Sequence, residues 1–238
     1  MDVLYVVIPA YNEEDNIEAV VSSWYQIVKK VGENSRLLII DDGSKDSTYQ
    51  ILKRLSNTLS QLIVITKDNS GHGSTLLFGY KYALKAGADF IFQTDSDGQT
   101  DPKEFWPFWE NREKFDYQIG YRKHRQDGFR RIVVTKMLKV ILFSIFHEWI
   151  TDANTPFRLM SASTLCEHIQ FVPNDYNLSN VLLSVLYQKS GQPGCYPEIT
   201  FLPRQGGVNK INMMKIFKIG MGAIKDLVSL RKSIKQLA

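Results

Sequence analysis

The segment Ile91-Phe92-Gln93-Thr94-Asp95-Ser96-Asp97-Gly98-Gln99 carries the clearest sign of fold in this chain of 238 residues. Its apolar beginning predicts a buried strand, which ends in two aspartates separated by one residue. Side chains at positions i and i+2 of an extended segment point the same way, so Asp95 and Asp97 can converge on one point. Open α/β sheets hold their ligands at the carboxyl ends of strands. The segment therefore predicts an α/β fold with an acidic site at one sheet edge.

The two aspartates also indicate a divalent cation. Two carboxylates so close repel each other unless a cation lies between them or one keeps a proton. Oxygen ligands of this kind suit Mg²⁺ or Mn²⁺, which commonly bridge protein carboxylates to substrate phosphates. A simple turn is the alternative reading, because Asp and Gly are common turn residues.

The first 120 residues alternate between continuous apolar runs and amphipathic stretches. This alternation is typical of a mostly parallel sheet with helices on both faces. It predicts strands at residues 3–8, 36–40, 62–66, 89–94 and 116–120, and helices at residues 13–31, 46–58 and 74–86. No linker or repeat interrupts the chain, so residues 1–209 are expected to form one domain.

The second half predicts helices at residues 130–150 and 177–190 and a strand at residues 194–202. Charged residues interrupt helix 130–150, whereas about 20 uninterrupted apolar residues are needed to cross a bilayer. This helix can lie on a membrane or pack in a core. Residues 210–238 are expected to form a basic amphipathic helical segment, which can lie in a membrane interface or pack on the domain.

Basic residues gather in two blocks, although the net charge of the chain is only +4. Residues 204–238 hold eight Lys or Arg against one Asp, and residues 121–140 hold seven against one Asp. Such blocks favour an anionic partner, with solvated helix faces as the alternative. Nucleic acid is disfavoured as that partner, because the blocks lack the interleaved aromatic pattern and the motifs of nucleic-acid binders.

The location of the protein is indicated by its cysteines and its beginning. Cys166 and Cys195 form neither a disulfide framework nor a zinc-ligand pattern, which favours a reducing compartment. The N-terminus begins with an apolar strand and shows no signal peptide. We therefore expect a cytoplasmic protein, with a peripheral position on the cytoplasmic face of a membrane in view of the basic blocks.

Polar segments also follow the other predicted strands, on the side where Asp95 and Asp97 lie. They are Pro9-Ala10-Tyr11-Asn12-Glu13-Glu14, Asp41-Asp42-Gly43-Ser44, Ser70-Gly71-His72-Gly73-Ser74 and Gly120-Tyr121-Arg122. Helix capping by the polar residues and chain turning by the glycines are the structural alternatives. Four such segments after successive strands indicate a functional site at this edge.

The order of these motifs resembles glycosyltransferase family 2. The motifs read Pro-x-Tyr-Asn-Glu-Glu, Asp-Asp-Gly-Ser-x-Asp-x-Thr, Gly-x-Gly, Asp-x-Asp-x-Gln, Gly-x-Arg and Asp-x-x-x-x-Phe-Arg. The resemblance runs from Val3 to about Asn209 and is nearest to the dolichol-phosphate mannose synthase-like branch of polyprenyl-phosphate sugar transferases. It implies a GT-A fold in residues 1–209 and inverting transfer of a sugar from a UDP- or GDP-linked donor.

The resemblance also implies roles for individual residues. The nucleotide sugar would be bound by Pro9, Tyr11, Glu13, Asp41, Asp42, Gly71, Gly73 and Asp95, with Asp42 in support. Mg²⁺ or Mn²⁺ would be held by Asp95, Asp97 and Gln99. The catalytic set would comprise Asp152, Arg122, Arg131, Arg158 and Arg204. Of these, Arg122, Arg131 and Arg204 would face phosphates, which a guanidinium binds bidentately.

The acceptor decides the chemistry that these residues must perform. A lipid phosphate is already anionic near neutral pH, because its second pKa is about 6, and it needs positioning rather than deprotonation. A saccharide hydroxyl would instead need a carboxylate base, for which Asp152 is the candidate. Asp152 can equally be the ion-pair partner of an arginine.

A polyprenyl phosphate at an anionic membrane surface is the favoured acceptor, since both basic blocks suit anionic lipids. A separate membrane protein is a further candidate partner. The chain departs from the family pattern at His72, Pro156 and Asn209, where lysine, glycine and serine are frequent.

Two other classes of protein share parts of this pattern. The segment Asp95-Ser96-Asp97-Gly98 resembles the first motif of haloacid-dehalogenase-type phosphatases, whose first Asp is a nucleophile. Those enzymes carry the motif on an early strand, and here it follows the fourth strand. A non-catalytic nucleotide-binding module at a membrane surface is the other alternative, and the intact pair of aspartates argues against it.

Overall fold

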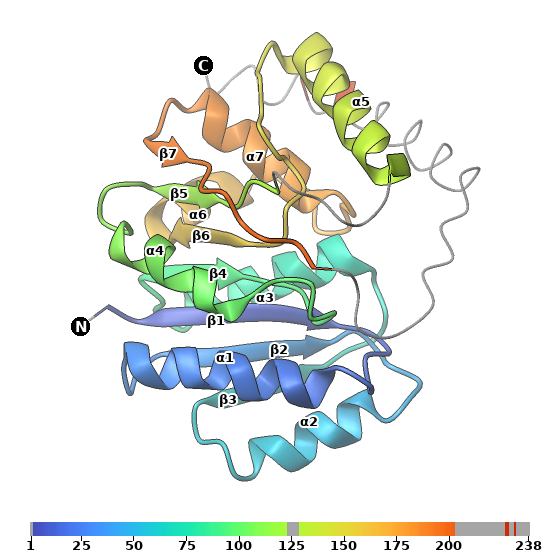
Figure 1. Cartoon of the computed structure of the whole chain (residues 1–238), viewed down its shortest axis with the longest axis vertical. Helices are drawn as coiled ribbons and strands as arrows, with labels where there is room; N and C mark the ends of the chain where they lie inside the picture. The colour runs from blue at the N-terminus through green and yellow to red at the C-terminus, as the bar shows by residue number, and fades with distance from the viewer. Residues whose placement is uncertain (1, 123–128, 203–226, 229–230, 232–238) are drawn as a thin grey trace.

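The computed structural model describes residues 2–122, 129–202, 227–228 and 231. Its centre is a seven-stranded sheet in the order β3-β2-β1-β4-β6-β5-β7 (Figure 1). The strands are β1 (Leu4–Ala10), β2 (Arg36–Asp41), β3 (Leu62–Thr66), β4 (Phe90–Gln93), β5 (Tyr117–Ile119), β6 (Arg158–Ser161) and β7 (Gly194–Cys195). All neighbouring strands pair in parallel except β6, which is antiparallel to β4 and β5. The expected mostly parallel sheet is confirmed.

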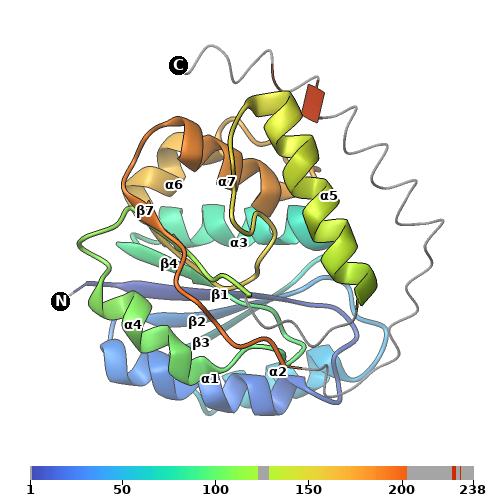
Figure 2. The ribbon, with the colours of Figure 1, turned by 45° about the horizontal axis from the view of Figure 1, so that its top comes forward.

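Helices cover both faces of this sheet, as the alternating pattern predicts (Figures 1 and 2). One face carries α1 (Ile17–Val31), α2 (Thr48–Ser56) and α4 (Phe105–Glu110), the last preceded by the short 3₁₀ helix η1 (Pro102–Glu104). The opposite face carries α3 (His72–Lys85), α6 (Ala162–Ile169) and α7 (Ser179–Lys189), and α5 (Phe129–Phe146) packs on this group. Each face therefore has its own apolar core.

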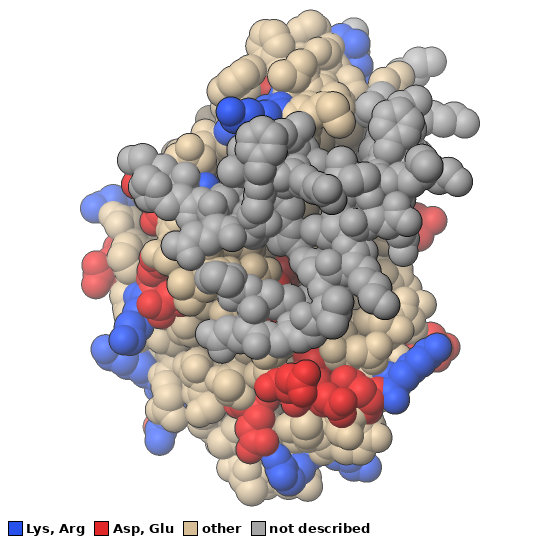
Figure 3. Space-filling model, turned by 45° about the vertical axis from the view of Figure 1, so that its right-hand side comes forward, with Lys and Arg blue, Asp and Glu red and all other residues tan. Residues whose placement is uncertain are grey.

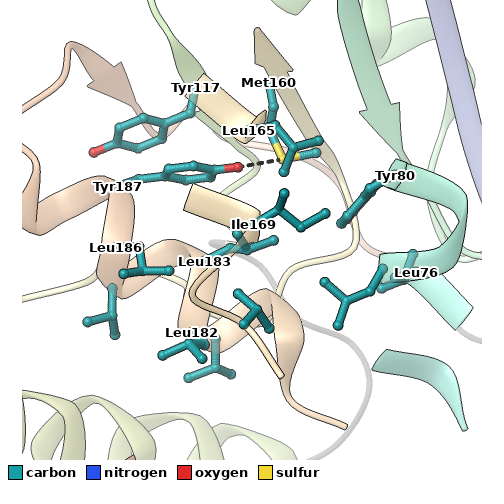
Figure 4. Packing of buried hydrophobic residues seen from close by; sticks show 14 of the residues in the cluster. Leu76, Tyr80, Tyr117, Met160, Leu165, Ile169, Leu182, Leu183, Leu186 and Tyr187 are labelled. Carbon is teal, nitrogen blue, oxygen red and sulfur yellow. Dashed lines mark hydrogen bonds between the residues drawn. The ribbon is translucent and has the colours of Figure 1, made fainter. Parts of the chain in front are cut away.

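The core beneath α1 and α4 is largely aromatic. Phe92 of β4 is fully buried and lies 5.2 Å from Trp24 and 4.7 Å from Phe157, measured between ring centroids. In the core on the opposite face, Tyr187 of α7 stacks on Tyr117 of β5 (Figure 4). Its hydroxyl donates a hydrogen bond to the Met160 sulfur, at 3.1 Å.

The observed elements differ from the expected ones where the chain leaves regular structure. The first helix begins at Ile17 rather than at residue 13, because Asn12 takes a positive φ of 53° and residues 12–16 form a loop. The helix expected over 130–150 ends at Phe146, since His147 has a φ of 61°. The strand expected over 194–202 is shortened to the two residues of β7.

The sequence pattern does not predict four of the observed elements: β6, α4, α6 and the 3₁₀ helix η1. β6 is only four residues long and begins with an arginine, so it does not read as a buried apolar run. The helical segment expected over 210–238 lies outside the described residues except for Leu227, Val228 and Arg231. Among the helices of the described part of the chain, none has the length and apolarity needed to span a bilayer.

Replacing Phe92 by alanine is expected to lower the free energy of unfolding by about 3–5 kcal/mol, because the ring fills the centre of one core. The matched control is Phe78→Ala, since Phe78 lies on the surface of α3 and is 41% exposed. Its effect should stay within about 0.5 kcal/mol. Urea unfolding measures both, and equal losses would contradict the packing described.

Candidate active site

The carboxyl ends of β1, β2, β3 and β4 meet at one edge of the sheet, because these four strands run in parallel. Figure 3 brings that edge forward and shows Asp and Glu side chains gathered on it. A cleft of about 380 Å³ opens there. It is lined by Pro9, Ala10, Tyr11, Glu13, Asp42, Asn69, Gly71, His72, Thr75, Asp95, Ser96 and Asp97. The cleft lies in the size range of small-molecule sites.

Asp95 and Asp97 both line this cleft and are both partly exposed. The Oδ1 atom of Asp95 lies 3.0 Å from Nε2 of His72, and Oδ1 of Asp97 accepts a hydrogen bond from the Gln99 N–H at 3.1 Å. The two carboxylates therefore face the same opening, as the spacing of the motif predicts.

The carboxylates at this point suit a divalent cation whose remaining ligands come from a substrate. In the part of the chain that the structure describes, no group of three or more His, Cys, Asp or Glu side chains comes together as a metal cage. Two carboxylates in an open cleft match the way Mg²⁺ is commonly bound, through one or two protein carboxylates plus substrate phosphates. Asp95 and Asp97 fit such an ion.

The loop after β1 provides one wall of the cleft. Tyr11 is 43% exposed, whereas Glu13 beside it is buried. The Glu13 N–H donates to the Thr48 hydroxyl at 2.8 Å, and its carboxylate accepts from the Asn16 amide at 2.9 Å. These bonds hold the loop in place while the tyrosine ring stays accessible.

Asp41 was expected to line the nucleotide pocket with Asp42 in support, and the structure shows the reverse arrangement. Asp41 is 1% exposed and does not line the cleft; its carboxylate accepts hydrogen bonds from the Thr66 hydroxyl and the Ser44 N–H. Asp42 lines the cleft instead. The physical reason is the alternation of side chains along a strand: Asp41 is the last residue of β2, and the side chain of the next residue points to the opposite face.

Asp42 holds the loop that leads from β3 into α3. It pairs with the Lys67 ammonium and accepts the N–H groups of Ser70 and Gly71, each at 3.0 Å. Burial alone would raise the pKa of Asp42, but the hydrogen bonds from Lys67 and Ser70 outweigh it, so the pKa lies below its ordinary value. Asp42 is therefore firmly ionised at neutral pH.

Glycine is needed at positions 71 and 73 because the segment with Tyr176 and Asn177 passes very close to the backbone there. Gly71 has a φ of 90°, and a Cβ at this position would collide with the Asn177 side chain. A Cβ at Gly73 would overlap the backbone of Tyr176 and Asn177. The segment before α7 thus packs against the start of α3, a contact that no local pattern in the sequence reveals.

His72 is the first residue of α3, and half of its side chain is exposed. Burial would lower the pKa of His72, but attraction to Asp95, and more weakly to Asp97 and Asp42, raises it above the ordinary value. These acidic neighbours favour the protonated form of His72, at a position where the family pattern frequently has lysine.

Arg122 and Asp152 form a buried ion pair next to β5. Their side chains are 8% and 3% exposed, and Nε and Nη2 of Arg122 each donate to one Asp152 oxygen at 2.8 Å. The Arg122 guanidinium also lies 5.0 Å from the centre of the Phe201 ring. The two residues expected to act on the acceptor side are thus brought together, with Asp152 engaged as an arginine partner.

Of the other expected site residues, Arg158 and Gln99 are described with their contacts, whereas the Arg131 side chain and Arg204 are not. Arg158 is fully buried, and its guanidinium contacts protein carbonyls, which corrects the expectation of a direct role on substrate. The Gln99 amide nitrogen donates to the Leu202 carbonyl at 2.8 Å. Arg131 lies on α5, but its side chain is outside the described atoms, as is the whole of Arg204.

Sequence reasoning missed Asn69 and Thr75, which line the cleft, and Lys67, which pairs with the cleft residue Asp42. Lys67 has a recognisable signal, because it is the first residue after β3 and so falls at the same edge as the motifs. Thr75 lies one turn inside α3, is fully buried and lines the cleft, and its hydroxyl makes no hydrogen bond of good geometry in the structure. Such a threonine cannot be distinguished by pattern from an ordinary helix residue.

Comparison with known proteins places the chain among sugar-transferring enzymes. The model of the family described as "Glycosyl transferase family 2" matches residues 5–167. The UDP-N-acetylglucosamine--dolichyl-phosphate N-acetylglucosaminyltransferase of Methanococcus voltae is 30% identical over 182 residues, which cover 68% of this chain and 70% of that protein.

Two further relatives are named undecaprenyl-phosphate 4-deoxy-4-formamido-L-arabinose transferase. The one from Proteus mirabilis is 27% identical over 58% of this chain, and the one from Pectobacterium atrosepticum is 23% identical over 90% of it. The alignments span 42% and 64% of those proteins, so the chain matches less than two thirds of their length.

Among solved structures, glucosyl-3-phosphoglycerate synthase from Mycobacterium tuberculosis, in complex with Mn²⁺, UDP and phosphoglyceric acid, is similar. The TM-score is 0.72 at 19% identity, over 97% of this chain and 78% of that one. This likeness shows the fold, and the expected GT-A architecture is confirmed.

Replacing Asp42 by asparagine is expected to destabilise the protein by about 1–3 kcal/mol at pH 7, because the Lys67 ammonium loses its charged partner. Since the pKa of Asp42 is lowered on folding, its contribution is present above the unfolded-state pKa of about 3.9 and is lost as the pH falls through the lower folded-state pKa. The stability difference between wild type and variant should therefore shrink below about pH 4.

The matched control for this measurement is Asp68→Asn, which makes the same charge change at an exposed neighbour. Urea unfolding at several pH values measures both variants. A constant difference between Asp42→Asn and wild type across the acid range would show that the ionised Asp42 does not stabilise the fold.

Proposed function

The chain belongs to glycosyl transferase family 2, and on that premise we propose that it transfers a sugar from a nucleoside-diphosphate sugar to a polyprenyl phosphate. The single observation that carries the proposal is the cleft in which Asp95 and Asp97 face the loops after β1, β2 and β3. The relatives named above act on dolichyl or undecaprenyl phosphate, which supports the same class of acceptor here.

The donor would lie in the cleft with its base near Tyr11 and Asp42. An accessible aromatic ring can stack on a base, and the carboxylates of Glu13 and Asp42 can accept hydrogen bonds from the nucleoside. The N-terminus of α3, a helix of 14 residues, opens into the same cleft and favours an anionic group. His72 would add positive charge at that point when its ring is protonated, the form that its acidic neighbours favour.

Asp95 and Asp97 would hold Mg²⁺ or Mn²⁺ on the donor diphosphate. A divalent ion bound there supplies Lewis-acid stabilisation of the negative charge on the leaving nucleoside diphosphate. Gln99 remains a candidate ligand through its side-chain oxygen, because its amide nitrogen is the atom that donates to Leu202. Asp41 supports the site from behind, through Thr66 and Ser44.

The acceptor is a phosphate rather than a hydroxyl, on this proposal, because of how Asp152 is bound. Both of its oxygens accept from Arg122, and a carboxylate so paired is a weak base. An anionic lipid phosphate needs no base: its oxygen attacks the anomeric carbon, the bond from that carbon to the donor phosphate breaks, and the nucleoside diphosphate leaves. A saccharide acceptor would require Asp152 to leave its arginine.

Arginine side chains would orient the acceptor phosphate. Arg122 is held rigidly by Asp152, so its guanidinium plane is fixed before substrate arrives. Arg131 and Arg204 are proposed as further phosphate contacts, because they belong to the two basic blocks of the sequence. Fixed guanidinium groups are the common protein solution for phosphate.

A panel of nucleotide sugars, each offered with undecaprenyl phosphate, dolichyl phosphate or a free saccharide, tests the proposal. We expect sugar transfer to a polyprenyl phosphate from one donor, with Mg²⁺ or Mn²⁺ present, and no transfer to the saccharide. Asp97→Ala should abolish turnover, whereas Asp68→Ala on a neighbouring exposed loop should keep it. Transfer to the saccharide alone, or an active Asp97→Ala variant, would refute the assignment.

Nucleotide and metal are expected to bind together. UDP or GDP with Mn²⁺ should raise the melting temperature, while either component alone should have little effect. A ligand at 100 times its dissociation constant stabilises a protein by about 2.7 kcal/mol, which is a readily measured shift. Asp97→Ala should lose the shift. Equal stabilisation by the nucleotide without metal would argue against the shared site.

The exposed side of α5 supports a peripheral position on a membrane. The helix buries Leu142, Ile145 and Phe146 yet leaves apolar side chains on its outer side. Met137, Val140 and Phe143 are about half exposed, and Trp149 just beyond the helix is 61% exposed. Residues three apart lie on one side of a helix, and apolar groups flanked by Lys136 suit the interface of an anionic bilayer. We propose that this side rests on the membrane that carries the acceptor.

Flotation with vesicles containing anionic lipid tests that position. The wild-type chain should float with the vesicles at low salt and less so at high salt, because screening weakens attraction of the basic residues. The double variant Val140→Glu and Phe143→Glu should stay in the soluble fraction. Phe78→Glu, which changes an exposed aromatic residue on α3, serves as the control and should float. Equal flotation of both variants would exclude α5 as the contact.

A further inference from the structure

Arg158 is a fully buried cation whose recorded hydrogen-bond partners are all neutral. Its guanidinium donates to backbone oxygens of Ala153 at 3.2 Å, Thr155 at 2.9 and 3.1 Å, and Asn180 at 3.2 Å, and to the Ser184 hydroxyl at 3.4 Å. These five bonds match the number of N–H groups that a guanidinium carries. The side chain is thus saturated by the protein itself.

Stability alone does not account for this residue. A buried cation is costly even where a carboxylate such as Asp152 attracts it, and replacing buried ionic groups by apolar ones of similar size is frequently neutral or stabilising. Burial lowers the pKa of Arg158, which means that the surroundings disfavour its charge. What the guanidinium does provide is a rigid planar set of donors that fixes several carbonyl groups at once.

Two of the three carbonyl groups that Arg158 binds, those of Ala153 and Thr155, belong to segment 153–155, which lies in neither a helix nor a strand; the third, that of Asn180, belongs to α7. This segment directly follows Asp152, whose carboxylate holds Arg122. The Ser184 hydroxyl adds a further bond to the Ala153 carbonyl at 3.0 Å. Asp152 is therefore attached to a loop that is tied down to α7 through Arg158.

Arg158 also occupies a central place in the sheet. It pairs in register with Gln93 of β4 on one side and with Ile119 of β5 on the other. Gln93 lies two residues before Asp95, and Ile119 lies three residues before Arg122. Arg158 thus lies between β4, which leads to Asp95, and β5, which leads to Arg122.

We propose that Arg158 is a positioning residue: by holding segment 153–155 against α7, it sets the place of the Asp152–Arg122 pair and hence of the acceptor phosphate. This inference rests on the proposed function and assigns to Arg158 no contact with substrate. It differs from a purely structural role because it predicts a loss confined to the acceptor side of the reaction.

Arg158→Lys is the informative variant, since lysine keeps the charge but has one compact group of donors instead of a planar fork. We expect kcat for transfer to fall by about 100-fold, because a misplacement of about 1 Å in a reacting group costs a factor of this order. The KM for the nucleotide sugar and the melting-temperature shift with UDP and Mn²⁺ should stay near wild type. Amide hydrogen exchange in segment 153–155 should become faster.

Tyr80→Phe is the matched control. Tyr80 is also fully buried in this region, and its hydroxyl bonds Gln93 at 2.6 Å and the Asn180 side chain at 3.4 Å. The change removes buried hydrogen bonds next to Arg158 without touching segment 153–155. It should lower the melting temperature while keeping kcat and the exchange of that segment near wild type.

Ser184→Ala is the second test variant and covers the case in which Arg158→Lys does not fold. It removes one bond to the Ala153 carbonyl, so kcat should fall in the same direction by about tenfold, with the donor KM unchanged. Wild-type kcat in this variant, together with unchanged exchange in segment 153–155, would overturn the inference.

Two further outcomes decide the matter. If Arg158→Lys loses kcat and nucleotide binding together, Arg158 is a general structural residue and the inference is wrong. If the wild-type chain transfers no sugar to any polyprenyl phosphate, the proposed function fails, and the exchange of segment 153–155 in Arg158→Lys still decides whether this residue holds the loop. Unchanged exchange there would overturn the inference on its own.

Discussion

Parallel pairing of β1 with both β2 and β4 is the constraint on which the site depends. The register sets Ala10 opposite Asp41 and Val7 opposite Gln93, so the loops that follow these strands emerge at the same edge. Tyr11, Asp42 and Asp95 are far apart in sequence, yet this pairing brings them to one cleft. Because side chains alternate along a strand, a slip of one residue would turn each set to the opposite face.

The antiparallel strand β6 determines where the loop with the proposed acceptor-side residue Asp152 emerges. It lies between β4 and β5, and the loop that leads into it carries Asp152. A fully parallel continuation would have brought this loop out at the opposite edge of the sheet. The reversal brings the loop that carries Asp152 out at the edge of the sheet where β1, β2 and β4 end.

Family membership indicates the type of reaction, whereas the contacts of individual residues indicate the acceptor. The GT-A fold and membership of family 2 define a sugar transferase, but a fold by itself hosts many acceptors. The state of Asp152 is more informative, since a carboxylate bound by both oxygens to Arg122 is suited to orienting an arginine and poorly suited to removing a proton. Both this state of Asp152 and the exposed apolar side of α5 favour a polyprenyl phosphate as the acceptor, because the polyprenyl chain of such a lipid remains in a membrane.

The sequence by itself determined the α/β class, the alternation of the first 120 residues and the acidic pair Asp95 and Asp97, because periodicity and short motifs report local structure directly. Tertiary structure decided that Asp42 rather than Asp41 lines the cleft, that β6 enters the sheet in reverse, and that Arg158 is buried. These outcomes depend on register and on contacts between distant segments. A pattern read along the chain contains no information on which neighbour a side chain will meet.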